Sequence, residues 1–284
     1  MHSSAADSEP GLQAVSQAPG RTGPVGVFDS GVGGLSVLRE IRLAMPGETL
    51  HYVADSGHAP YGEKSADYIE ARTVHIIEFL RTLDAKAIVV ACNTVTGLII
   101  QRLRERFPSL PMVAIEPAVK PAAQVTRSGV VGVLATRQTV ASPGLARLVS
   151  TYGDGKRMLL QACPGWVERV ERGELDSPDT EAAVAAYVRP LVEQGADTLV
   201  LGCTHYPFLA PVIQRMAGSS VQVIDPAAAV ARELGRRLTQ LGLEAPASHH
   251  IAPEHFWTSG DVTQAERVMT RLWGHPVHPR PLPG

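Results

Sequence analysis

A short apolar run that ends in a cysteine occurs twice in this chain, and it constrains the fold more than any other feature. The first copy is Ala87-Ile88-Val89-Val90-Ala91-Cys92-Asn93-Thr94, and the second is Thr198-Leu199-Val200-Leu201-Gly202-Cys203-Thr204-His205. Continuous runs rich in Val, Ile and Leu are typical of strands buried on both faces of a parallel sheet. Each cysteine is therefore expected at the carboxyl end of a strand, where open α/β sheets bind their ligands.

Further segments repeat with nearly the same separation. Ile115-Glu116-Pro117-Ala118 follows the first cysteine run, and Ile224-Asp225-Pro226-Ala227 follows the second. Val25-Gly26-Val27-Phe28 precedes the first cysteine run, and Val131-Gly132-Val133-Leu134 precedes the second. Unrelated α/β units also share apolar strands, but the matched order favours an internal duplication. We therefore predict an α/β fold with two similar doubly wound domains related by pseudo-twofold symmetry.

Composition and charge narrow the class of protein. The 284 residues suffice for two domains of ordinary size. A net charge of −2 gives no electrostatic reason to expect a nucleic-acid or membrane partner. No apolar run approaches the roughly 18 residues of a membrane span. Three cysteines without the spacing of a disulfide framework favour a reduced, cytoplasmic compartment.

The two ends of the chain differ in composition from the middle. Residues 1–22 are rich in Ser, Ala, Gln, Pro and Gly and lack the basic start and apolar core of a secretory signal. Because they can bury little, we expect a disordered N-terminal extension. The Pro-rich segment 276–284 is predicted to be a tail, and Phe256-Trp257-Thr258-Ser259-Gly260 a last edge strand.

Polar, glycine-rich loops follow the first two expected strands. The loop Asp29-Ser30-Gly31-Val32-Gly33-Gly34 can let the backbone approach a ligand closely. Its aspartate could act on the proton of a neighbouring thiol. In the next loop, Tyr61 and Gly62 could bring a hydroxyl and a bare N–H into the cleft. Cys163 ends another strand, but Pro164 removes the backbone donor behind it, so Cys163 is assigned to packing.

Two thiols at equivalent strand ends would face each other across the interface between the domains. Such a pair suits racemisation, in which one thiolate removes the α-proton and the opposite thiol protonates the other face. A free thiol has a pKa of about 8.5, so each thiol needs a neighbour. Asp29 could serve Cys92, and His205 could serve Cys203. Backbone N–H groups must also stabilise the enolate-like charge, and further donors in these loops are Asn93, Thr94 and Thr204.

Other interpretations of these cysteines stay open at this point. They could be core residues, the usual fate of a free cysteine, although the adjacent polar pairs disfavour this. A zinc site lacks its C-x-x-C or H-x-E pattern, and His249, His250 and His255 are expected to be exposed, so no metal is predicted. One cysteine could be an amidase nucleophile with His205 as base, which leaves the second without a task. A non-catalytic binding protein would need neither thiol.

Four motifs together resemble the glutamate racemases of the aspartate/glutamate racemase superfamily. They are Asp29-Ser30-Gly31-Val32-Gly33-Gly34-Leu35, Pro60-Tyr61-Gly62-Glu63-Lys64, Ala91-Cys92-Asn93-Thr94 and Gly202-Cys203-Thr204-His205-Tyr206-Pro207. The resemblance covers about residues 25–260, with the motifs in the family's order. It implies a cofactor-independent interconversion of L-glutamate and D-glutamate that supplies D-glutamate for peptidoglycan. A racemase for aspartate or a hydantoin is the alternative within the same fold.

The resemblance also implies roles for individual residues. Cys92 and Cys203 correspond to the two acid/base thiols, with Cys92 expected to act on D-glutamate and Cys203 on L-glutamate. The groups implied to assist the thiols are Asp29, His205 and Glu171. The implied substrate-contacting residues are Asp29, Ser30, Tyr61, Gly62, Asn93, Thr94, Thr204 and His205.

Domain boundaries and regulation follow from the same resemblance. It implies a first domain of residues 23–118 completed by 227–275, a second domain of residues 119–226, and a site between them. The chain departs from the family's usual sequence at Val95-Thr96 and at Gly165-Trp166. The extension at the N-terminus is similar to that of longer members that respond to a peptidoglycan precursor, which suggests such an activator. A monomer or a homodimer is expected.

Overall fold

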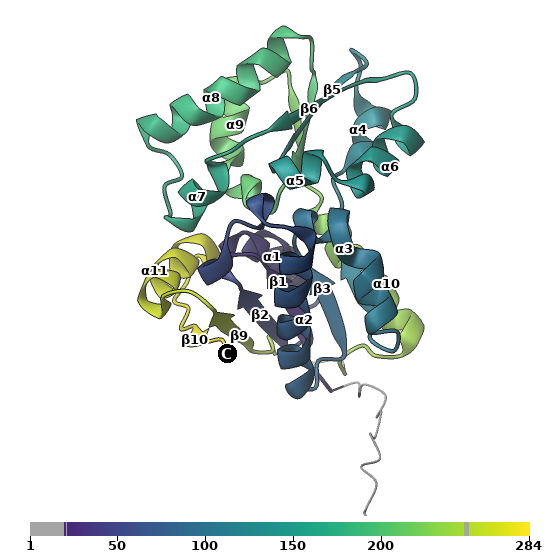
Figure 1. Cartoon of the computed structure of the whole chain (residues 1–284), viewed down its shortest axis with the longest axis vertical. Helices are drawn as coiled ribbons and strands as arrows, with labels where there is room; N and C mark the ends of the chain where they lie inside the picture. The colour runs from purple at the N-terminus through teal and green to yellow at the C-terminus, as the bar shows by residue number, and fades with distance from the viewer. Residues whose placement is uncertain (1–19, 21, 247–249) are drawn as a thin grey trace, which may run out of the picture.

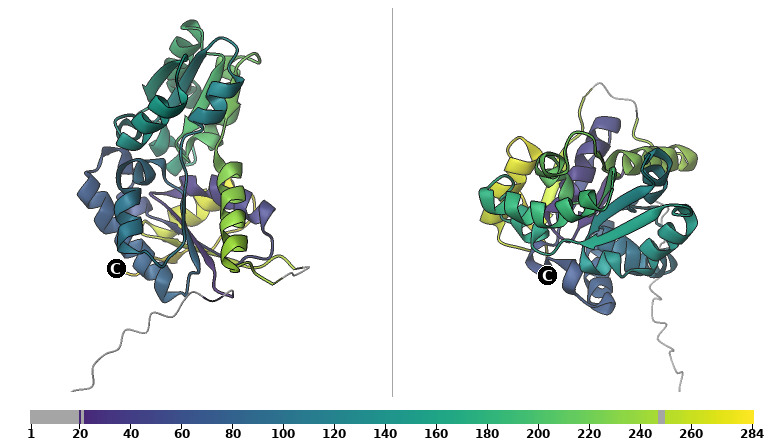
Figure 2. Two further views of the ribbon diagram at one scale, coloured as in Figure 1. Left: turned by 90° about the vertical axis from the view of Figure 1, so that its right-hand side faces the viewer. Right: turned by 90° about the horizontal axis from the view of Figure 1, so that it is seen from above.

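The computed structural model describes residues 20, 22–246 and 250–284. The predicted N-terminal extension therefore falls, apart from Gly20 and Thr22, outside the described residues. Figure 1 shows two α/β units stacked along the long axis of the molecule, and the side view in Figure 2 shows the same stacking. Within these ranges, none of the helices has the length and apolar character needed to cross a membrane.

The lower unit in Figure 1 is built on a six-stranded parallel sheet with the order β10-β9-β2-β1-β3-β4. Its strands are β1 (Val25–Asp29), β2 (Leu50–Ala54), β3 (Ala87–Val90), β4 (Met112–Ala114), β9 (Glu254–Thr258) and β10 (Arg280–Pro281). The helices of this unit are α1 (Leu35–Ala44), α2 (Ala66–Thr82), α3 (Asn93–Arg106), α10 (Ala227–Leu241) and α11 (Val262–Trp273). Val27 packs in one apolar cluster with α1 and α10, and Phe28 packs in another with α2 and α3. Helices thus bury both faces, which is why the strands read as continuous apolar runs.

The upper unit contains a four-stranded parallel sheet with the order β6-β5-β7-β8. Its strands are β5 (Val130–Ala135), β6 (Arg157–Ala162), β7 (Thr198–Gly202) and β8 (Gln222–Ile224). Its helices are α4 (Val119–Val125), α5 (Arg137–Val140), α6 (Pro143–Tyr152), α7 (Trp166–Glu171), α8 (Pro178–Glu193) and α9 (Ala210–Ala217).

The two sheets repeat one topology. The order β2-β1-β3-β4 of the first sheet matches β6-β5-β7-β8 of the second, strand by strand. Cys92 follows β3 and Cys203 follows the equivalent β7. The prediction of two α/β domains built on parallel sheets is therefore confirmed, and the shared order supports an internal duplication. We propose that the domain boundaries lie near residues 118 and 226, because the strands of one sheet end and those of the other begin there.

The C-terminal segment differs from its prediction. β9 is not an edge strand, because it pairs with β2 on one side and β10 on the other. The expected tail at 276–284 instead contributes β10 and the buried side chain of Val277. Pro281 fits this position because an edge strand leaves one side of its backbone without hydrogen-bond partners. The last residues thus complete the first sheet.

A buried ion pair anchors the amino end of β3, the strand that leads to Cys92. Lys86 Nζ lies 2.6 Å from Glu48 Oε2, and the two side chains are 1% and 5% exposed. Glu48 Oε1 also accepts a hydrogen bond from the Ala245 N–H at 2.8 Å. Removal of one partner would leave a buried charge without compensation, which is strongly destabilising.

We therefore expect Lys86→Met to lower the free energy of unfolding in urea by about 3–5 kcal/mol. The matched control is Arg81→Met, because Arg81 pairs with Glu78 at 2.7 Å with both side chains about half exposed. That change should cost no more than about 1 kcal/mol. Equal losses in the two variants would contradict a stabilising role for the buried pair.

Candidate active site

The carboxyl ends of β3 and β7 bring the two predicted thiols to one cavity between the units. Cys92 is the N-cap of α3, and Cys203 follows β7 directly. Both cysteines line this cavity and are 4% and 7% exposed. The cavity volume is about 10 Å³, the space of about one water molecule. A ligand larger than a water molecule can bind only if the cavity widens.

Most residues predicted to contact substrate lie in the wall of this cavity. They are Ser30, Tyr61, Gly62, Asn93, Thr94, Thr204 and His205. Asp29 lies behind the wall, where it contacts Ser30 and Thr204. The sequence motifs are far apart along the chain, so the fold has gathered them at the edges of both sheets.

Cys92 lies beside a buried carboxyl group. Its Sγ donates to Ser30 Oγ at 3.9 Å, and the Ser30 N–H donates to Asp29 Oδ1 at 2.7 Å. Burial raises the pKa of Cys92 well above its usual value, and the nearby Asp29 carboxylate raises it further. Burial also raises the pKa of Asp29, although the charge of His205 opposes this. The Cys92 side is therefore suited to hold a proton.

Cys203 lies beside a buried imidazole. His205 Nδ1 is 3.8 Å from Cys203 Sγ, and His205 Nε2 is 2.6 Å from Glu171 Oε1. Burial alone would lower the pKa of His205, but the hydrogen bonds to Cys203 and Glu171 outweigh burial and raise it well above 6.5. The imidazole lies beside the Cys203 thiol, so it can take part in proton transfer at this cysteine.

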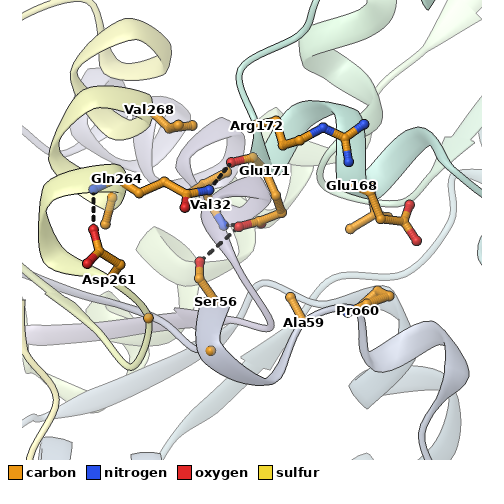
Figure 3. Close-up of a pocket in the computed structure, with 14 residues that line it drawn as sticks. Val32, Ser56, Ala59, Pro60, Glu168, Glu171, Arg172, Asp261, Gln264 and Val268 are labelled. Carbon is orange, nitrogen blue, oxygen red and sulfur yellow. Dashed lines mark hydrogen bonds between the residues drawn. The ribbon is translucent and has the colours of Figure 1, made fainter.

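Glu171 lies at the end of α7 and is held by the opposite unit. The Val32 N–H donates to Glu171 Oε1 at 2.7 Å, and Ser56 Oγ donates to Oε2 at 2.9 Å. Figure 3 shows Glu171 directed toward these two residues, while Glu168 points the other way. Glu171 thus contacts both His205 and the first unit. Gly165, one of the departures from the family sequence, begins α7 with φ of 85°, a conformation that glycine adopts easily.

Glu171 also forms part of the wall of a second, larger cavity. This cavity has a volume of about 290 Å³ and lies between α7, α11 and the loop that follows β2 (Figure 3). The Glu171 side chain is 15% exposed, whereas His205 is only 1% exposed. Solvent therefore reaches the outer side of the carboxylate but not the imidazole.

Two glycines of the first loop permit the close approach of these groups. A Cβ atom on Gly33 would lie 2.2 Å from His205 Nδ1, and one on Gly31 would lie 1.9 Å from Glu171 Oε1. Any larger side chain at either position would displace the His205–Glu171 pair. The glycines of this loop thus make room for the second unit.

Asn93 and Thr94 differ in the state of their polar groups. Asn93 Oδ1 and Nδ2 are both buried and have no hydrogen-bond partner in the described part of the chain. A buried amide without partners is costly, so this side chain is available to a ligand. Thr94 Oγ1 instead lies 3.0 Å from Thr136 Oγ1 and 3.3 Å from Thr139 Oγ1, across the interface.

Thr136 and Thr139 were not predicted as site residues. A signal for them was present in the sequence, because their loop follows β5 as the loop of Asp29 follows β1. The duplication therefore places both loops at the same cavity. Tyr61 lines the cavity, and its hydroxyl donates to Asp55 Oδ2 at 2.5 Å.

Cys163, His250 and His255 do not line this cavity. Cys163 is 2% exposed and its Sγ contacts the Gln161 carbonyl at 3.5 Å, as expected for packing. His249 lies outside the described residues, and His250 is exposed. His255 is half-buried, with its ring centroid 5.0 Å from that of His51, so its predicted exposure is wrong. In the described part of the chain, no three His, Cys, Asp or Glu side chains are grouped to hold a metal.

Comparison with known proteins identifies relatives over most of the chain. The family model described as Asp/Glu/Hydantoin racemase matches residues 26–234. A glutamate racemase of Ectopseudomonas mendocina is 54% identical over 251 residues, which is 88% of this chain and 95% of the relative.

Solved structures agree with this relationship. A glutamate racemase isoform from Bacillus anthracis has a TM-score of 0.82 and 33% identity, covering 92% of this chain and 97% of that one. The Escherichia coli glutamate racemase, solved in complex with L-glutamate and the activator UDP-MurNAc-Ala, has a TM-score of 0.79 and 32% identity. That match covers 91% of this chain and 97% of the other.

The contact between Glu171 and His205 predicts a change in titration. Glu171→Gln removes a charge that helps raise the pKa of His205, so that pKa should fall, as measured by NMR titration of the ring. The raised pKa stabilises the fold below pH 6.5 and this stabilisation is lost as pH rises through the folded-state value. Relative to the parent protein, the variant should therefore lose more free energy of unfolding near pH 6 than at a pH above the folded-state pKa of His205. Glu168→Gln is the control, and an unchanged His205 titration in Glu171→Gln would contradict the assignment.

Proposed function

The chain belongs to the Asp/Glu/hydantoin racemase family, in which it is a glutamate racemase, and on this premise we propose a cofactor-independent mechanism with two thiols. One thiolate removes the α-proton of glutamate, and the opposite thiol protonates the other face of the carbon. One observation carries the proposal. Cys92 and Cys203 follow equivalent strands and line one buried cavity, each beside a group that can take part in proton transfer.

The two thiols have different neighbours, which supports their division of labour. With L-glutamate bound, Cys203 accepts the α-proton beside the charged His205, and Cys92 donates its own proton. The turnover leaves a proton on Cys203 and a thiolate on Cys92. That is the protonation state required to act on D-glutamate, so each product state is the starting state of the reverse reaction.

Stabilisation of the carbanion is the second requirement, because the α-proton of an amino acid is very weakly acidic. The free amide of Asn93 and the backbone N–H groups of the loops around the cavity can hold the substrate carboxylate. Donors preorganised in a closed cavity act more strongly than the same donors in water. The burial of both thiols in this cavity therefore supports the mechanism.

We place this reaction in the cytoplasm, where D-glutamate would be supplied for peptidoglycan synthesis. All three cysteines are free and buried, which suits a reducing compartment. The family model also covers racemases of aspartate and hydantoins, so these are the alternative substrates. A panel of the three substrate types distinguishes them. A cysteine-dependent amidase would instead release ammonia and form a thioester that can be trapped.

Replacement of either thiol tests the mechanism. Cys92→Ser and Cys203→Ser should each reduce racemisation by at least about 10²–10⁴-fold, because a serine hydroxyl is a much weaker acid than a thiol. The optical rotation of L-glutamate over time, with purified, reduced protein and no added cofactor, is the measurement. Cys163→Ser is the matched control, since Cys163 is equally buried but lies outside the cavity. Normal turnover in either site variant would exclude a two-thiol mechanism.

We also propose that a peptidoglycan precursor activates the enzyme. The observation behind this is the Escherichia coli relative, whose structure is described with UDP-MurNAc-Ala as activator. The expected result is a higher initial rate of L-glutamate racemisation when UDP-MurNAc-Ala is added, and UDP alone is the control. A rate that is the same with and without the precursor would exclude activation.

A further inference from the structure

A cluster of hydrogen bonds centred on Asp55 lies behind the wall of the active-site cavity. Tyr61 Oη donates to Asp55 Oδ2 at 2.5 Å. Arg72 binds both oxygens of the same carboxylate, with Nε 3.1 Å from Oδ2 and Nη2 2.8 Å from Oδ1. The Asp55 side chain is completely buried, and that of Arg72 is 21% exposed. A two-point contact of this kind fixes the orientation of the carboxylate.

The cluster joins three separate elements of the first unit. Asp55 follows β2 directly, and Arg72 lies on α2. Tyr61 lies in the short 3-10 helix Tyr61–Glu63, whose first two residues line the cavity. Asp55 and Arg72 are not in the cavity wall, and Tyr61 and Gly62 provide a route by which they can act on a bound ligand.

The charges within the cluster depend on one another. Burial alone would raise the pKa of Asp55, but hydrogen bonds from Arg72 and Tyr61 outweigh burial and lower it. The carboxylate is therefore ionised at neutral pH. A buried carboxylate that loses one of these donors is left partly unsatisfied, so the cluster holds its geometry as a unit.

The segment held by this cluster forms the first unit's side of the closed interface. A Cβ atom on Gly62 would lie 2.9 Å from Thr136 Cβ, so the two backbones approach closely there. Two residues further on, the Lys64 carbonyl accepts a hydrogen bond from Gln138 Nε2 at 3.0 Å. The position of this segment therefore helps to set the shape of the cavity.

We propose that Asp55 and Arg72 are positioning residues for substrate binding, acting through the Tyr61 ring and the Gly62 backbone. This proposal rests on the racemase function, because it concerns the site at which glutamate would bind. It assigns no proton transfer to Asp55. The cluster instead fixes one wall of the cavity so that either enantiomer is held with its α-carbon between the two thiols.

Asp55→Asn and Tyr61→Phe test the proposal with little change in side-chain size. Loss of a hydrogen bond to a charged group is worth about 1.5–3 kcal/mol, so KM should rise about tenfold or more for both enantiomers. L- and D-glutamate have equal free energies, so kcat/KM must fall equally in the two directions. The primary isotope effects with 2-deuterio-glutamate should be unchanged, because the proton-transfer groups remain.

A double-mutant cycle distinguishes positioning from loss of folded protein. If Asp55 acts through Tyr61, the double variant should be no worse than either single variant. Partial unfolding would reduce kcat by reducing the number of active molecules, but it would leave KM unchanged. The control is Arg81→Lys, on the same helix as Arg72 but in a half-exposed pair with Glu78, which should leave KM unchanged.

The outcomes separate this inference from the proposed function. If the parent enzyme does not racemise glutamate, the proposed function fails. If it does, but KM is unchanged in Asp55→Asn, or the effects of Asp55→Asn and Tyr61→Phe simply add, the positioning role is wrong. A raised KM in both single variants, with no further rise in the double variant, would support it.

Discussion

Each thiol of this site depends on hydrogen bonds that cross between the two units. Asp29, beside Cys92 in the first unit, accepts a hydrogen bond from Thr204 Oγ1 of the second unit at 3.0 Å. Glu171, in the second unit, accepts the N–H of Val32 from the first. Each carboxylate therefore has donors from both units. The contact between the units thus brings the proton-transfer groups together and shields them from water.

The duplication gives the two cysteines equivalent places but different chemistry. Cys92 begins a long helix and lies beside the buried carboxyl of Asp29, and burial raises the pKa of both groups. Cys203 lies beside His205, whose pKa is raised by its hydrogen bonds to Cys203 and Glu171. Two like residues thus have neighbours of opposite kind, as is common where a site needs both an acid and a base.

The local sequence was sufficient to predict the main strands and the position of the two cysteines at strand ends. An apolar run reports directly that a strand is buried, and the polar residues after it mark where the strand ends. It was insufficient wherever a side chain's partner lies far along the chain. The Tyr61 hydroxyl binds Asp55, and nothing in the sequence near Tyr61 favours this over the cleft. Strand β10 has two residues, one of them proline, and pairs only because β9 offers its free edge. Thr136 and Thr139 could have been predicted from the repeat, because their loop after β5 corresponds to the loop of Asp29 after β1.

The order of the strands also affects how the protein is made. The chain leaves the first sheet after β4, forms the whole second sheet and returns to the first unit with α10. Leu50 of β2 is therefore separated by about 200 residues from its pairing partner Glu254 in β9. On the ribosome, the second unit can fold as soon as it emerges, while the first keeps an open edge at β2. An open strand edge can pair with other chains. The nascent first unit therefore has an unpaired strand edge at β2 throughout synthesis of the second unit, and β9 covers that edge.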